Sequence, residues 1–163
     1  MSDEQLEKAI WTDGDFDMMG WHDATVHAIA FHEDEQDAEL LLDLDYIVRW
    51  IDPEPPAEYF SFLVAPATLV FENVWDLQGE LGAYERTLLQ IQDIHRREPE
   101  NDRQRNVGVQ PWVLEWSQGD ELTFLASGFR QHFRRRPAHT ASQCLELDAR
   151  GGICFDKPPD FPA

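Results

Sequence analysis

The chain has 163 residues, 42% of them hydrophobic, and it carries 32 acidic side chains against 13 Lys and Arg, for a net charge of −19. This hydrophobic content is enough for a folded core and excludes a disordered or fibrous protein. The excess of carboxylates argues against direct binding of nucleic acid or of anionic membranes, because both need a positive protein surface.

Most of the excess negative charge falls in the first half of the chain. Residues 1–80 hold 20 acidic and 2 basic residues, whereas residues 81–163 hold 12 acidic and 11 basic residues. Solubility alone explains a large net charge, and a basic protein partner is also compatible with it. The polar start and the lack of a long apolar run predict a cytoplasmic protein without a transmembrane helix.

Residues 2–11 are predicted to form a short helix. Ser2 and Gln5 have the spacing of a capping box, and Leu6, Ala9 and Ile10 would form one apolar stripe. The helix would be only about two turns long, so it needs packing against the rest of the fold to persist.

From residue 24 the hydrophobic pattern changes to a period of two, which is typical of strands. The clearest segment is Glu39–Ile51, which a loop at residues 32–37 connects to a preceding strand at residues 25–31. One face of the segment is entirely apolar, with Leu40, Leu42, Leu44, Tyr46, Val48 and Trp50. The other face carries Leu41, Asp43, Asp45, Ile47 and Arg49.

The remaining chain favours more strands joined by short turns. Two expected strands lie at residues 59–64 and 68–77, with a break between them at Pro66. Another is expected at residues 87–96, within a segment (81–97) whose pattern also fits a helix. Residues 112–117 and 122–126 are expected to form a hairpin, and a weak strand pair is expected around Gly151-Gly152. Residues 98–110 are predicted to be a long mobile loop, and residues 157–163 a loosely held tail.

These elements predict a single domain over residues 1–163, mainly β, built as an antiparallel sandwich or partly open barrel with a short N-terminal helix. The turn expected near Gly151 offsets Cys144 from Cys154, so we expect free thiols rather than a disulfide.

Four residues form the candidate site: Asp23, His27, Asp43 and Asp45. Asp23 and His27 share a parity, and Asp43 and Asp45 lie on the polar face of the adjacent strand, so a hairpin would bring an imidazole and several carboxylates together. Such a set suits acid–base chemistry or a metal ion. The simpler interpretation, which we favour, is a solvated polar sheet face that binds nothing. No metal or other cofactor is therefore expected.

The second half contains a basic run, with Arg130, Arg134, Arg135 and Arg136 close together. Anion binding is one possible role, but the strongly negative overall charge favours pairing with the acidic first half or with a partner. Glycine-rich phosphate loops and the motifs of nucleophilic enzymes are missing from the sequence.

Three motifs carry a resemblance to a known family: Trp21-His22-Asp23 with His27, the segment Leu42–Trp50, and the segment Val64–Val74. In these motifs, and onward through Ser127-Gly128-Phe129 to Gln143, the chain resembles a family of small uncharacterised bacterial proteins over most of its length, which implies no particular activity. In size, acidity and β-rich pattern it is more loosely similar to immunity proteins that neutralise bacterial toxins.

The sequence therefore predicts a soluble, non-enzymatic binding protein, an inhibitor or immunity-type partner of a basic protein. The alternative is a small enzyme or ligand-binding barrel that uses the polar face with His27, Asp23, Asp43 and Asp45.

Overall fold

The computed structural model describes residues 6–33, 35–81 and 88–159, and it confirms a mainly β, antiparallel fold. The strands are β1 (Ile10–Thr12), β2 (Thr25–Glu33), β3 (Ala38–Ile51), β4 (Ser61–Glu72), β5 (Trp75–Gly79), β6 (Leu89–Arg96), β7 (Gln110–Trp116), β8 (Glu121–Ala126), β9 (Gly128–Phe133) and β10 (Ala138–Thr140). The helices are short: a 3-10 helix, η1 (Asp13–Met18), then α1 (Asp102–Val107) and α2 (Leu147–Arg150).

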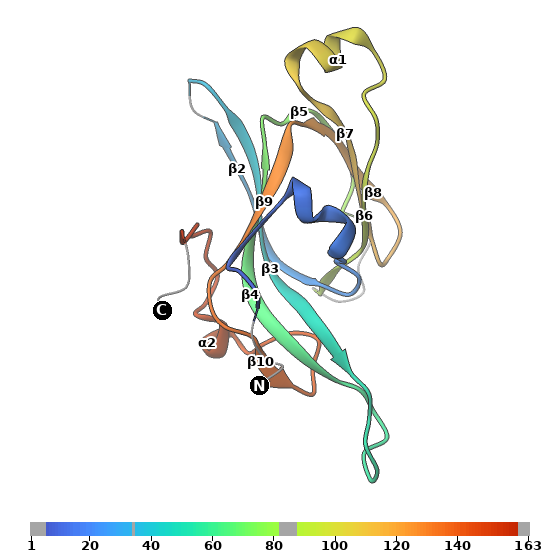
Figure 1. Cartoon of the computed structure of the whole chain (residues 1–163), viewed down its shortest axis with the longest axis vertical. Helices are drawn as coiled ribbons and strands as arrows, with labels where there is room; N and C mark the ends of the chain where they lie inside the picture. Colours follow the sequence, from blue (N-terminus) through green and yellow to red (C-terminus); the bar gives the residue numbers. More distant parts are fainter. Residues whose placement is uncertain (1–5, 34, 82–87, 160–163) are drawn as a thin grey trace.

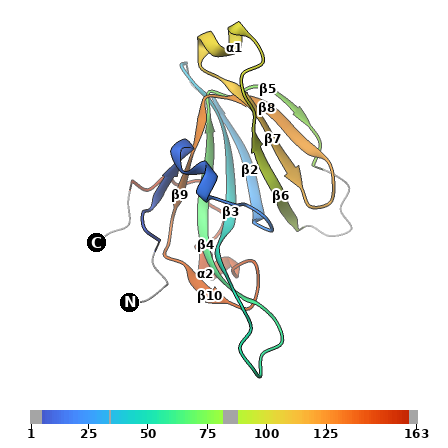
Figure 2. The ribbon, with the colours of Figure 1, turned by 45° about the vertical axis from the view of Figure 1, so that its right-hand side comes forward.

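The strands belong to one sheet that is not closed into a barrel. Their order is β1-β9-β4-β3-β2-β6-β7-β8-β5, and β10 pairs with β4 (Figure 1). The sheet folds over on itself where β2 meets β6, a junction of only two residue pairs, Thr25 with Gln90 and Val26 with Leu89. Strands β9, β4, β3 and β2 thus form one layer, and β6, β7, β8 and β5 form another (Figure 2).

The main core lies between these layers, and the apolar face predicted for β3 points into it. Leu40, Leu42 and Leu44 are fully buried there. Aromatic rings fill the centre in edge-to-face contacts, with centroids 5.3 Å apart for Phe71 and Trp112 and 5.9 Å apart for Trp112 and Phe129. Such pairs add about 0.5–1.5 kcal/mol each beyond burial of their area.

The predicted helix at residues 2–11 is wrong where it can be compared, since residues 2–5 lie outside the described residues. Residues 6–9 are irregular, and Ile10–Thr12 pair with β9 as β1. The helical segment is η1, which begins after Thr12 and carries a capping box formed by Thr12 and Asp15. A two-turn helix leaves most of its backbone N–H and C=O groups without a hydrogen-bond partner. Pairing with the edge of the sheet supplies such partners, so the strand is the more stable structure here.

The expected break at Pro66 is also wrong, because β4 runs unbroken from Ser61 to Glu72. Pro66 lies where one neighbour strand ends and the next begins: β9 pairs from Ala67 onward, and β10 pairs up to Val64. The Pro66 carbonyl accepts a hydrogen bond from the Arg134 amide. The Pro66 nitrogen therefore faces away from β3, and the missing proline N–H removes no hydrogen bond to that strand.

The second half agrees with the predictions only in part, since the sequence did not predict β9 or β10. Strand β6 and the β7–β8 hairpin are confirmed. The expected loop at residues 98–110 contains α1, because the Asn101 side chain caps its first turn and Gly108 ends it with a positive φ. Helix α2 replaces the strand pair expected around Gly151-Gly152. None of the described helices is long and apolar enough to cross a membrane.

Candidate functional site

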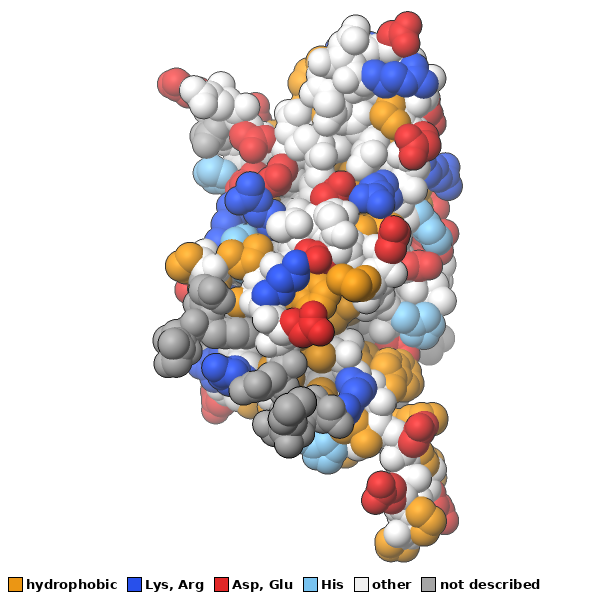
Figure 3. Space-filling model, viewed as in Figure 1, with side chains coloured by type: hydrophobic (Ala, Val, Ile, Leu, Met, Phe, Trp, Pro, Cys, Tyr) orange, Lys and Arg blue, Asp and Glu red, His pale blue; other side chains and the backbone are white. Residues whose placement is uncertain are grey.

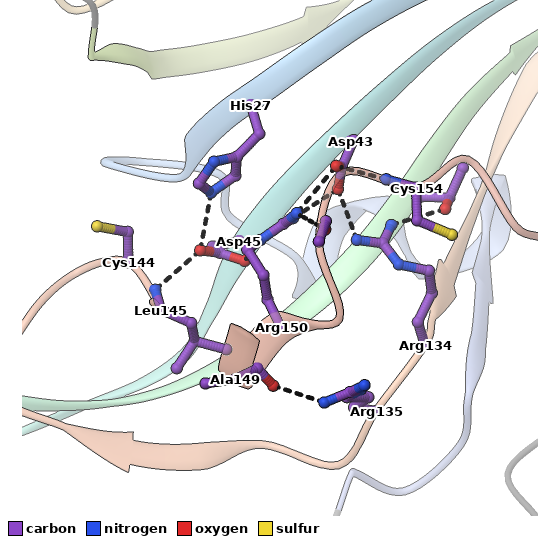
Figure 4. Close-up of polar contacts among 12 residues, drawn as sticks. His27, Asp43, Asp45, Arg134, Arg135, Cys144, Leu145, Ala149, Arg150 and Cys154 are labelled. Atoms are coloured by element: carbon purple, nitrogen blue, oxygen red, sulfur yellow. Dashed lines mark hydrogen bonds and ion pairs between the residues drawn. The ribbon is translucent and has the colours of Figure 1, made fainter. Parts of the chain in front are cut away.

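The structure brings three of the four predicted site residues together on the outer face of the β2–β3–β4 layer (Figure 4). The His27 Nε2 atom lies 3.0 Å from Oδ2 of Asp45, and Asp43 lies two residues before Asp45 on β3. Both Asp side chains are completely buried. The predicted solvated polar face is therefore wrong, and the reason is that a distant segment covers it.

That segment is the C-terminal strap, which we define as residues 143–158. It crosses the outer face of the sheet, and α2 holds its central residue, Arg150, against β3 (Figure 4). The helix ends at Gly151, which has a φ of 81°, a conformation that favours glycine. The carbonyl of Gly152, also at positive φ, accepts a hydrogen bond from Arg150.

Arg150 is the centre of the buried ion cluster. Its Nη1 and Nη2 atoms donate to the two oxygens of Asp43 at 2.9 and 2.5 Å, and its Nε donates to Oδ1 of Asp45 at 3.0 Å. The planar guanidinium fork suits this double contact, which a lysine cannot make. The side chain has no exposed surface, so its charge depends on these two carboxylates.

A second guanidinium completes the cluster from the end of β9. Arg134 donates to Oδ1 of Asp43 at 2.5 Å and to the Thr68 hydroxyl at 2.8 Å. This contact, together with the pair between Arg130 and Glu72 at 3.0 Å, confirms that the basic run pairs with the acidic first half. Two arginines thus balance the charges of two aspartates.

Every oxygen of the two carboxylates is used. Besides the arginines, Asp43 accepts the backbone N–H of Cys154 at 3.0 Å, and Asp45 accepts that of Leu145 at 2.9 Å. Burial by itself raises the pKa of Asp45, but the hydrogen bonds from His27, Leu145 and Arg150 outweigh it, so this pKa lies below the ordinary value. Burial by itself lowers the pKa of the Arg150 guanidinium, but its contacts with Asp43 and Asp45 outweigh burial. This pKa therefore lies above the ordinary value.

Asp23 does not join the cluster. It lies before β2 at a φ of 63° and accepts a hydrogen bond from the Gln143 side chain at 2.8 Å. Gln143 is the first residue of the strap, so Asp23, Asp43 and Asp45 all hold the same segment. The end of the strap is fixed as well: Lys157 pairs with Glu39 at 2.7 Å, and the carbonyl of Pro158 lies 3.0 Å from the His132 Nδ1.

These contacts correct the expected loose tail for residues 157 and 158; residues 160–163 lie outside the described residues. Cys144 and Cys154, both in the strap, are free as predicted. Within the described residues, no three His, Cys, Asp or Glu side chains gather in a way that could hold a metal ion. The arrangement binds the chain's own C-terminal strap, and its carboxylates leave no open oxygen for a substrate.

Sequence reasoning missed Arg150 and Thr68, and it did not connect Arg134 with Asp43. One signal was available: Leu41 and Ile47 flank the aspartates on the supposedly polar face, which suggests that something covers it. No family model, curated protein or solved structure matches this chain. The resemblance to a bacterial family therefore stays a prediction.

Proposed function

We propose that the protein is a non-enzymatic binding protein whose partner is a basic protein, in the manner of an inhibitor or immunity protein. One observation carries the proposal: the buried arginines are neutralised internally, and the chain still has 19 more acidic than basic residues. The first half supplies most of this excess, and its carboxylates at Glu33, Glu35 and Glu54 are exposed. This surplus charge is available to a partner.

An excess of this size acts at long range. It attracts a positively charged protein before contact and raises the association rate, and salt weakens the effect. The same field repels nucleic acid and anionic lipid. A protein partner with a basic surface is the class that remains.

The alternative, a small enzyme or ligand-binding protein, has one observation in its favour: the 3.0 Å contact between His27 and Asp45. A carboxylate at this distance orients an imidazole, as in many acid–base sites. However, the same carboxylate is committed to Leu145 and Arg150, so the contact is explained by the attachment of the strap. We rank this function second.

A pull-down with the full chain, at about 50 mM and about 500 mM NaCl, tests the proposal, since salt screens exposed charges between these conditions. We expect the retained protein to be basic and, once purified, to associate at least about tenfold faster at the lower salt. An acidic partner, or an association rate that does not change with salt, would contradict the proposal. The variant H27Q, which changes the residue on which the alternative depends, should bind the partner normally.

A further inference from the structure

Strands β3 and β4 continue beyond the body of the sheet as a two-stranded arm, which we define as residues 49–61. Its last pairs are Trp50 with Phe62 and Ile51 with Ser61, and residues 52–60 connect the two strands. The neighbouring strand β10 reaches only to Phe62. Both ribbon views show the arm projecting from one end of the molecule (Figures 1 and 2).

The arm displays aromatic side chains to solvent. Tyr59 is 82% exposed, Phe60 47% and Trp50 44%, and none of them belongs to either core cluster. The ring centroid of Trp50 lies 5.9 Å from that of Phe60 and 5.0 Å from that of Phe62, both edge to face. An isolated two-stranded hairpin is only marginally stable in water, and these ring contacts support it.

Carboxylates surround the aromatic side chains. Asp52, Glu54 and Glu58 are all exposed, and Arg49 is the single basic residue of the arm. Hydrophobic and carboxylate side chains cover the projecting end in the space-filling view (Figure 3). Aromatic anchors within a charged rim are the usual composition of an interface whose centre loses its water on binding.

We infer that the arm is the binding element for the basic partner and enters a cleft lined by Lys and Arg with an apolar floor. This inference rests on the proposed function. Charge favours such a partner over a second copy of this chain, because two acidic arms repel each other. Tyr59 and Phe60 supply the buried contacts, and the carboxylates pair with the basic rim.

Residues 52–60 of the arm can be removed without touching either core. Ile51 and Ser61 are directly paired, so a two-residue Asn-Gly turn in place of residues 52–60 forms a standard tight hairpin. The binding probe is the basic protein that the full chain retains at low salt, purified separately. We expect the shortened variant to keep its melting temperature within about 4 °C and to lose at least about 100-fold in affinity.

Point variants separate the contributions of shape and charge. Y59A and F60A should each weaken binding by about 30-fold, whereas the control F31A, an exposed phenylalanine on β2, should leave it unchanged. E54Q with E58Q should slow association more than E33Q with E35Q, which removes the same charge at the end of β2 and in the β2–β3 connection.

The outcomes distinguish the two proposals. If the shortened variant still binds the purified basic protein with full affinity, the arm inference is wrong and the proposed function stands. If no basic protein binds the full chain, both are wrong. If light scattering finds a dimer that removal of residues 52–60 dissolves, the arm binds a second copy and the inferred partner is wrong.

Discussion

Truncation of Arg150 to alanine tests whether the buried ion cluster holds the fold together. The substitution leaves Asp43 and Asp45 buried, with four remaining contacts between them, from Arg134, Cys154, His27 and Leu145. Breaking a buried ion pair from one side costs about 3–5 kcal/mol. Arg134 still neutralises Asp43, and His27 still contacts Asp45, so we expect the lower part of this range, about 3–4 kcal/mol.

The assay is urea unfolding followed by the fluorescence of the buried tryptophans. In a thermal melt of a chain of this length, the same loss of free energy should lower the melting temperature of R150A by roughly 6–16 °C. The matched control is R135A, because Arg135 is exposed and donates to the Ala149 carbonyl rather than to a buried carboxylate; it should change stability by less than about 0.5 kcal/mol. R150K keeps the charge and loses the fork, so it should fall between the two. A loss below about 1 kcal/mol for R150A, with an unchanged slope against urea, would refute the reasoning.

Two further predictions concern pH and backbone geometry. The pKa of Asp45 is lower in the folded state than in the unfolded state. Its contribution to folding stability is therefore complete above the ordinary carboxyl pKa and is lost as the pH falls through the folded-state pKa. Thermal melts at a series of pH values should show that D45N flattens this loss of stability in acid. G79A should destabilise by more than about 2 kcal/mol, because Gly79 has a φ of 132° and a Cβ there would lie 2.0 Å from the Glu121 carbonyl oxygen. G108A, at a φ of 73° in open space, should lose only about 1–2 kcal/mol, and equal losses for the two variants would contradict the clash.

Local pattern predicted several of the strands and one face of β3, but it missed β1, β9 and β10. The alternation over residues 39–51 correctly predicted that Leu40, Leu42 and Leu44 face the core, because a strand has a period of two regardless of its partners. The same alternation placed Asp43 and Asp45 on the opposite face, which is also correct.

Local pattern could not reveal what covers that opposite face. The covering side chain, Arg150, lies 107 residues after Asp43, and no periodicity connects them. Arg150 sits on a four-residue helix, where a charged residue is ordinarily exposed, so its complete burial depends on the tertiary position of the strap. The expected N-terminal helix failed for a related reason: the partner of Ile10 is His132 on β9.

The position of the strap after β2, β3 and β4 in the chain has a consequence for the order of folding during synthesis. The ribosome produces β2, β3 and β4 before the two arginines that neutralise their aspartates, Arg134 and Arg150. Until Arg150 emerges, this layer must keep its outer face hydrated and incompletely packed, since an unpaired carboxylate is costly to bury. Pairings so distant in sequence also form slowly. This layer therefore completes its packing only after the strap has emerged.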